Sequence, residues 1–171
     1  MDPVESAKAS MGGIERIVSA LPGIQGYREK EMRRDADRQV RNQFVHELED
    51  RRTRIARLEV GLLGAGGLLW MDDIEQLVGR TQMLMDRVRT APSGYAGFFD
   101  LQRVKEPELD KLAEFDKALF ESLPKLDEAI AALEKAAPAN EGIQQAVGAV
   151  ADLLAQLNDT FGHRMEAIRN A

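Results

Sequence analysis

Residues 141–169 read EGIQQAVGAVADLLAQLNDTFGHRMEAIR, and this stretch decides the fold class. Its apolar side chains follow an almost uninterrupted alternation of four- and three-residue steps; they are Ile143, Val147, Val150, Leu154, Leu157, Phe161, Met165 and Ile168. Such steps place side chains on one face of an α-helix, and a pattern sustained over nearly four heptads is typical of coiled coils and helical bundles. The stretch therefore predicts a long helix that buries one face against other helices.

Three segments that precede this stretch show the same periodicity. Residues 107–136, 68–90 and 27–62 each place apolar side chains three and four positions apart. At 1.5 Å per residue, a helix over 27–62 is about 54 Å long. Residues 91–107 and 137–140 interrupt the pattern with Pro, Gly or Asn, which favour turns and loops. The chain therefore reads as long helices joined by shorter connections.

Two positions carry expectations about helix breaks and ends. Pro124 lies inside the apolar pattern of 107–136. An interior proline removes a backbone donor and clashes with the preceding turn, so we expect a kink or a break into two helices there. Asn140 stands just before the last helix. Its side chain can accept a hydrogen bond from the free amides of the first turn, so we predict that it is an N-cap.

The N-terminal region predicts a shorter amphipathic helix over residues 4–20, ended by Leu-Pro-Gly at 21–23. We treat 1–171 as a single helical domain, in which 1–22 forms an N-terminal helix that can lie apart from the main bundle. No stretch shows the alternation of a convincing strand. The predicted fold is therefore all-α: an elongated antiparallel bundle of about five helices, with one long helix at about 27–62.

Composition and charge exclude several classes of function. The chain has no cysteine, which rules out disulfides, thiolate metal sites and cysteine nucleophiles, and fits a reducing compartment. Its net charge of −6 argues against a dedicated nucleic-acid binder. Residues 27–59 carry ten basic and eight acidic residues, whereas 100–171 carry eight and fourteen. The arginine-rich segment can therefore lie against the acidic half, or both can be solvated helix faces. With neither a secretory signal nor a membrane-spanning stretch in evidence, we expect a cytoplasmic protein.

An apolar stretch, VGLLGAGGLLWM at 60–71, stands where the chain must reverse between two helices. Three interpretations compete. The glycines permit a tight reversal while the leucines and Trp70 cap the bundle core. Alternatively, the patch is exposed and covered by another protein chain, or it meets lipid. In the last two cases Leu68, Leu69 and Trp70 are the contact residues.

An aromatic cluster occupies the connection at 91–107. Within SGYAGFFD it holds Tyr95, Phe98 and Phe99, and aromatic side chains at this density favour an ordered segment. They either fill a gap between helices or form a docking loop for a partner, with Phe98 or Phe99 as its anchor. Tyr95 and Asp100 alone make a weak acid–base pair, so we predict no catalytic residue here.

Two histidines invite a test for metal binding. His46 and His163 each begin a His-x-x-Glu motif, with Glu49 and Glu166, and two such pairs on facing helices are able to bind a metal. Di-iron bundles use the reverse order and further inward-facing glutamates, which this chain lacks at its apolar seams. Residues 60–71 match no phosphate-binding glycine motif. We therefore predict no metal, cofactor or catalytic residue.

These observations favour a non-enzymatic helical scaffold or adaptor that acts through protein–protein interaction and self-association. The predicted partners are another protein and further copies of the chain, with no nucleic acid and no evident small-molecule substrate. One alternative is a peripheral membrane protein that uses the 60–71 tip or the N-terminal helix, although a membrane surface is the less favoured partner. A metal-binding helical-bundle enzyme is the more remote alternative.

Overall fold

A computed structural model describes residues 30–64, 67–91 and 106–169, with side chains described over 37–63, 67–91 and 111–167. These residues form four α-helices and one short 3₁₀ helix, and they contain no strand. The predicted all-α fold is confirmed. The elements are α3 (Lys30–Gly64), η2 (Leu68–Trp70), α4 (Met71–Thr90), α5 (Glu106–Ala139) and α6 (Ile143–Arg169).

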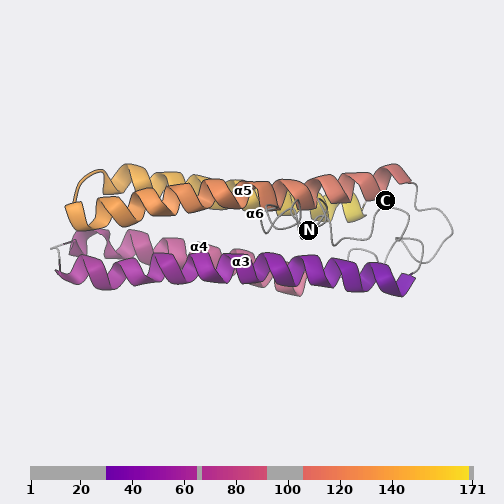
Figure 1. Ribbon diagram of the computed structural model, residues 1–171, viewed down its shortest axis with the longest axis horizontal. Coiled ribbons are helices and arrows are strands. Elements are labelled where there is room, and N and C mark those ends of the chain that lie inside the picture. The colour runs from indigo at the N-terminus through magenta and orange to yellow at the C-terminus, as the bar shows by residue number, and fades with distance from the viewer. Residues whose placement is uncertain (1–29, 65–66, 92–105, 170–171) are drawn as a thin grey trace, which may run out of the picture.

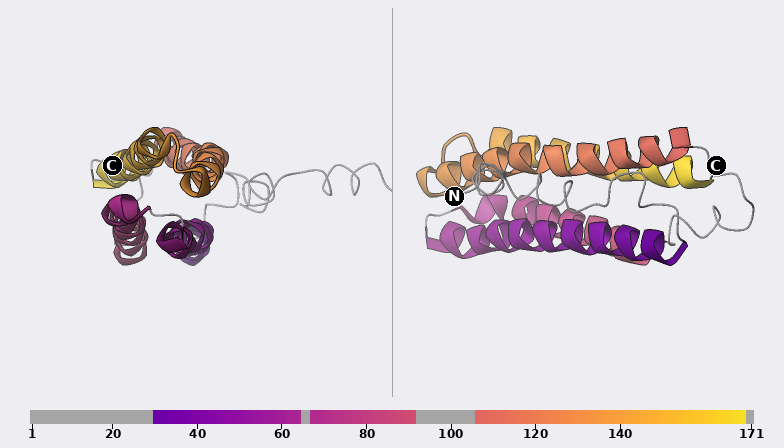
Figure 2. Two further views of the ribbon diagram at one scale, coloured as in Figure 1. Left: turned by 90° about the vertical axis from the view of Figure 1, so that its left-hand side faces the viewer. Right: turned by 45° about the vertical axis from the view of Figure 1, so that its right-hand side comes forward.

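The four helices form two antiparallel hairpins, α3–α4 and α5–α6, that pack side by side into an elongated bundle (Figure 1). The hairpins begin at the same end of the molecule, so α3 runs parallel to α5 and α4 runs parallel to α6. The end-on view of Figure 2 shows α5 over α3 and α6 over α4. The predicted antiparallel order therefore holds within each hairpin, whereas neighbours from different hairpins are parallel.

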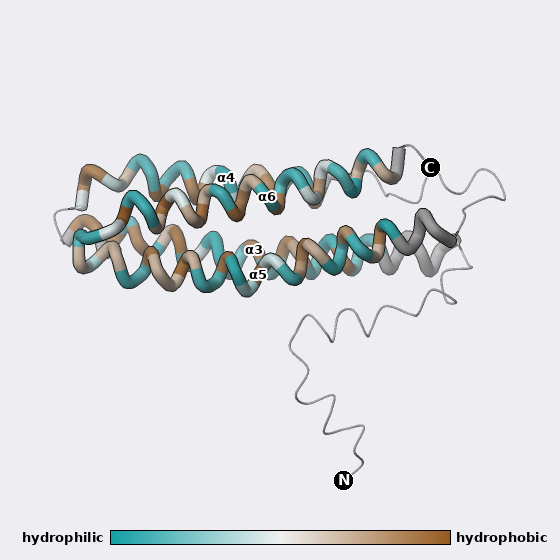
Figure 3. The backbone as a smooth tube through the Cα atoms, turned by 90° about the horizontal axis from the view of Figure 1, so that it is seen from above, coloured by the Kyte–Doolittle hydropathy of each residue, from teal (hydrophilic) through white to brown (hydrophobic). Residues whose placement is uncertain are grey.

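A continuous apolar core runs between the hairpins. Figure 3 shows hydrophobic and hydrophilic stretches alternating along each helix, as the heptad pattern requires. Phe44 of α3 meets Phe120 of α5 edge to face, with ring centroids 5.5 Å apart. Each buried leucine or isoleucine contributes roughly 1.5–3 kcal/mol. The apolar residues with no exposed surface are Leu48, Ile55, Leu62, Ile74, Met85, Val88, Leu126, Ile130, Leu133 and Val150.

The predicted helix boundaries lie within three residues of the observed ones. The helix predicted over 4–20, the 1–22 segment and all but the margins of the 91–107 connection lie outside the described residues. No helix in the described ranges has both the length and the apolar composition needed to cross a membrane.

The helix α5 does not break at Pro124. The proline is exposed, while Leu123 and Leu126 beside it are buried at 1% and 0% exposure. Core packing on both sides of Pro124 therefore holds the helix together across the missing backbone donor. The expectation of two separate helices is wrong for this reason.

The N-cap prediction for Asn140 is also wrong, because this residue terminates α5 instead. Its φ of 50° lies in the left-handed region that asparagine tolerates better than most residues. The amide of Asn140 donates to the carbonyl of Ala137 at 3.2 Å, and that of Glu141 donates to Ala136 at 3.3 Å. This pair of bonds is a Schellman motif, which satisfies the last carbonyls of a helix. Gly142, with φ of 70°, completes the turn into α6.

Candidate interaction surface

Four large apolar side chains are exposed where α3 meets α4, at one end of the bundle. Val60 is 74% exposed, Leu63 60%, Leu68 65% and Leu69 80%. We call these four residues the apolar end. Met83 is the one other large hydrophobic side chain that is strongly exposed among the described residues. Because exposed apolar side chains gather here, the apolar end is the candidate site for a partner.

Backbone contacts hold the apolar end in place. The amide of Gly67 donates to the carbonyl of Leu62 at 3.0 Å, and the amide of Trp70 donates to the carbonyl of Gly67 at 2.9 Å. A Cβ atom on Gly67 would lie 2.5 Å from Cδ2 and 3.2 Å from Cβ of Leu62, so any other residue requires the buried Leu62 side chain to shift. Leu62 is buried in the core and η2 packs against it, so Leu68 and Leu69 face the solvent.

The residues predicted for interaction therefore differ in their exposure. Leu68 and Leu69 are exposed, so the interpretation that they cap the core is wrong for these two residues. Trp70 is half-buried and packs against the core, as that interpretation requires. Tyr95, Phe98 and Phe99 lie outside the described residues, so their role as a docking loop remains a prediction.

A shallow, open cavity lies next to the apolar end. It has a volume of about 430 Å³ and is lined by Trp70 of η2 and by residues 140–145 around the α5–α6 turn. Gln144 and Gln145 bring side-chain amides that can donate and accept hydrogen bonds. The cavity thus offers polar groups beside four apolar side chains, the combination found at the rim of protein interfaces.

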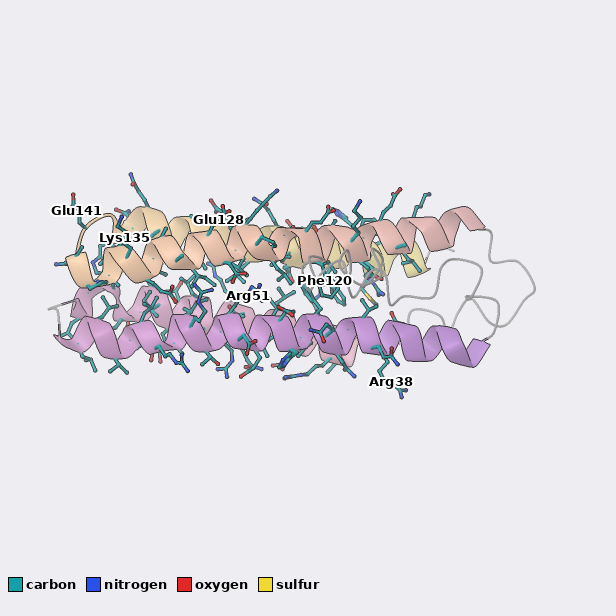
Figure 4. All side chains as sticks on the ribbon, viewed as in Figure 1. Arg38, Arg51, Phe120, Glu128, Lys135 and Glu141 are labelled. Carbon is teal, nitrogen blue, oxygen red and sulfur yellow. The ribbon has the colours of Figure 1, made fainter. Side chains whose placement is uncertain are left out.

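Charged residues around the apolar end are mainly acidic, although Lys135 near the end of α5 is an exposed cation at this end of the bundle (Figure 4). Asp72 and Asp73 stand in the first turn of α4, where negative charge is favoured by the helix dipole. Glu75 is exposed one turn further on, and Glu59 is half-exposed at the end of α3; Arg57 is an exposed cation on the same helix. The chemistry of this end therefore suits an apolar surface flanked by positive charge.

The opposite end of the bundle contains a buried ionic cluster. Arg164 of α6 is 1% exposed. Its Nη2 donates to Asp37 of α3 at 2.6 Å, and its Nε donates to Asp116 of α5 at 2.6 Å. Asp37 also accepts from Nε of Arg41 at 3.0 Å, and Nη1 of Arg41 donates to the carbonyl of Ala91, at the end of α4, at 2.6 Å. The cluster thus connects all four helices.

Two arginines and two aspartates cancel their formal charges in this cluster, which makes their burial tolerable. Burial raises the pKa of the Asp116 carboxyl, and the Arg164 guanidinium offsets part of that rise. Burial lowers the pKa of Arg164, but the carboxylates of Asp116 and Asp37 outweigh burial and hold it above its usual value. Within the described part of the chain, Nη1 of Arg164 has no hydrogen-bond partner.

The sequence contained a signal for this cluster that an apolar pattern alone misses. The four-three steps that lead to Phe161 continue to Arg164, and those that begin at Leu112 continue to Asp116. The same steps on α3 run through Asp37 and Arg41. Charged residues at seam positions therefore mark a buried ionic layer, whereas hydrophobicity alone assigns Met165 to the seam in place of Arg164.

A second set of ion pairs joins α3 to α5. Arg54 donates two hydrogen bonds to Glu134, of 2.9 and 2.8 Å, and a third to Asp127 at 2.9 Å. Arg51 donates to Asp127 as well, and Figure 4 shows Arg51 between the two hairpins. The hydrogen bond from Arg54 lowers the pKa of Glu134. The arginine-rich segment therefore lies against the acidic half within one molecule.

The two histidines do not come together in a metal site. His46 on α3 and His163 on α6 are exposed on helices that lie diagonally across the bundle. In the described ranges, no group of three or more His, Asp or Glu residues is placed to hold a metal ion.

Comparison with known proteins finds no matching family model, no matching curated protein and no matching solved structure. The geometry of the two bundle ends and of the helix faces is therefore the basis for a functional inference.

Proposed function

We propose that the protein is a non-enzymatic scaffold or adaptor of the cytoplasm that binds a protein partner through the apolar end. The observation that carries the proposal is the exposure of Val60, Leu63, Leu68 and Leu69 at one end of a bundle whose described surface is otherwise mainly polar. Burying a leucine side chain yields roughly 1.5–3 kcal/mol, so four such residues supply a substantial driving force for association.

The local geometry supports this proposal. Leu68 and Leu69 belong to a 3₁₀ turn that is tied to α3 by the Gly67–Leu62 hydrogen bond and by their close contact. A rigid surface loses little conformational freedom on binding, which leaves more of the hydrophobic gain as affinity. The cavity beside Trp70 then offers a place for a partner side chain to anchor.

The packing of Trp70 and the charges around it favour a protein partner over a lipid bilayer. Trp70 is half-buried against the core, so only part of its ring can reach a membrane interface. Asp72 and Glu75 are exposed near the apolar end, and anionic headgroups repel such carboxylates.

The test combines cross-linking in cells with a matched pair of variants. A photo-reactive amino acid at position 69 should capture a discrete protein, and Leu68→Asp in the same chain should abolish that product. The probe placed at position 132, on the exposed face of α5, is the control, with Ala131→Asp as its matched substitution. Equal capture at positions 69 and 132, or a product indifferent to Leu68→Asp, would contradict the proposal.

Liposome co-sedimentation separates the membrane alternative. The wild type should stay in the supernatant with both neutral and anionic vesicles. Sedimentation that is lost in Leu68→Asp/Leu69→Asp, with unchanged helicity, would assign the apolar end to lipid instead.

A further inference from the structure

A second surface, formed by α4 and α6, has features that the apolar end does not explain. Two shallow cavities of about 320 and 290 Å³ lie along these helices, and Arg87 lines both. Met83, which is 65% exposed, stands beside the first cavity. This α4–α6 face is therefore grooved, and it carries one exposed apolar side chain beside the groove.

Charges on the two helices follow the same spacing. Arg80, Met83 and Arg87 stand at steps of three and four on α4; Asp152, Ala155 and Asp159 do the same on α6. All six residues are exposed. Of the ion pairs between described residues, none involves either arginine or either aspartate of this set. Two basic positions on one helix thus match two acidic positions on the other, at a constant offset of 72 residues.

The fold places the matching positions at the same height along the bundle. Nη1 of Arg87 donates to the backbone carbonyl and to Oδ1 of Asn158, at 3.0 and 2.6 Å. Since α4 and α6 are parallel, these contacts give their register: Arg87 reaches Asn158, 71 positions later, and it also lies against Phe161 and Gly162, 74 and 75 positions later. The offset of 72 residues between the charge patterns therefore lies within the range of offsets, 71 to 75, that the Arg87 contacts give for the two helices.

We propose that two copies of the chain associate through their α4–α6 faces, about a two-fold axis parallel to the helices. Rotation about such an axis does not shift a residue along the bundle, so equivalent residues of the two copies lie at the same height. It also places α4 of one copy against α6 of the other. Arg80 then meets the partner's Asp152, Met83 meets the partner's Ala155, and Arg87 meets the partner's Asp159. The symmetry repeats each contact, so four ion pairs flank two methionine contacts.

Small residues on α6 fit this arrangement. Gly148, Ala155 and Gly162 recur at seven-residue intervals on the same helix. A Cβ atom on Gly148 would meet nothing within 4 Å inside one chain, so packing within the monomer does not require glycine there. At Gly148 and Ala155 a second helix can approach closely, as helix ridges packing into grooves require, whereas the guanidinium of Arg87 in the same chain lies against Gly162. This dimer goes beyond the proposed adaptor function, because it uses no residue of the apolar end.

Charge exchange between the two helices gives the decisive test. Arg80→Asp and Asp152→Arg should each weaken dimerisation by about tenfold or more, since each replaces two exposed ion pairs with like-charge contacts. An equimolar mixture of the two variants should recover dimers of wild-type affinity, because the new carboxylate on α4 of one chain then faces the new guanidinium on α6 of the other. Sedimentation equilibrium over a concentration series measures the dissociation constants, and circular dichroism shows whether each variant is folded.

The matched control is Glu128→Arg, which reverses a charge on the outer side of α5 (Figure 4) and should leave the mass unchanged. A wild type that stays monomeric at every concentration would overturn the proposal. Dimers that resist both α4 and α6 variants, or a mixture that fails to associate while both variants are folded, would overturn it as well.

Engineered cysteines test the orientation, since the native chain has none. Mixing Met83→Cys with Ala155→Cys should give a covalent dimer under mild oxidation, whereas Met83→Cys by itself should not. Rapid cross-linking of Met83→Cys with itself would mean that α4 faces α4, and it would exclude the parallel arrangement.

Discussion

At the residue scale, Arg164 shows how a charge can occupy a position that leucine fills elsewhere in the bundle. Its guanidinium meets Asp37 and Asp116, so the buried charge is compensated from two other helices. Reasoning from hydrophobicity passes over Arg164, although the heptad steps lead to it. The sequence does not show which carboxylates contact Arg164. Asp37 and Asp116 are far apart along the chain, and only the folded bundle brings them together.

Removing Arg164 should be costly. In Arg164→Met the buried Asp116 carboxylate loses its partner and Asp37 keeps only Arg41, and breaking a buried ion pair typically costs about 3–5 kcal/mol. Urea denaturation measures the free energy of unfolding. Arg57→Met, on the exposed face of α3, is the control and should change it by about 0.5 kcal/mol or less. A loss below about 1 kcal/mol in Arg164→Met would contradict a role for the cluster in stability.

Two glycines should respond in opposite ways to alanine. Gly67→Ala forces a Cβ against Leu62, and overpacking of this kind costs about 1–3 kcal/mol. Gly79→Ala, inside α4 with open space around it, should stabilise the protein by about 0.5–1 kcal/mol through helix propensity. Thermal unfolding of the two variants and the wild type checks both signs; a neutral Gly67→Ala would show that η2 moves away freely.

At the scale of elements, apolar periodicity was sufficient to place all four described helices. It could not say which helices are neighbours, because a heptad stripe fits any partner with a similar stripe. Ion pairs specify that α3 packs beside α5: Arg51 and Arg54 on α3 bind Asp127 and Glu134 on α5. The sequence allowed such a pairing between its arginine-rich and acidic halves, but it allowed solvated faces as well.

This α3–α5 contact should be sensitive to acid. The Arg54 hydrogen bond lowers the pKa of Glu134 from its usual 4.5, so its stabilising effect is fully present above 4.5 and is lost as pH falls through the lowered value. Because 36% of the Glu134 side chain is exposed, screening limits the contribution to about 1 kcal/mol or less. Glu134→Gln should therefore flatten the acid limb of the stability profile, measured by urea denaturation between pH 3 and 7.

Asp116 should act with the opposite sign, which makes it a useful comparison. Its raised pKa means that the folded state holds a proton more tightly than the unfolded chain does. The contribution of this group to stability is therefore fully present below pH 3.8 and is lost as pH rises through the raised value.

The control for Glu134→Gln is Lys117→Gln, which changes an exposed residue on the same helix, α5. An acid limb identical in wild type and Glu134→Gln would contradict the assigned role.

At the scale of the whole molecule, the two ends of the bundle differ in kind. One end exposes leucine and valine, and the other buries three ion pairs. A parallel dimer through α4 and α6 brings two apolar ends to the same end of the particle. A partner with two matching sites would then bind with greater avidity than a single site allows. The sequence predicted self-association but could not assign it to a face, because exposure of Met83 and the register of α4 with α6 are properties of the fold.

The shape of the assembled particle separates the two surfaces. If copies associate along their sides, small-angle scattering should show a maximum dimension close to that of the monomer and a larger cross-section. Association through the apolar ends would nearly double the length. Leu68→Asp should leave the dimer intact in the first case and dissolve it in the second.

Both hairpin turns lie at one end of the bundle, and residues 92–105 alone link α4 to α5. Severing the chain there leaves each helix pair with its own turn, and every interhelical contact between the halves is noncovalent. Residues 30–91 and 106–169 should therefore behave as a split protein, whose fragments recognise each other by matching Arg164 from one piece with Asp37 from the other.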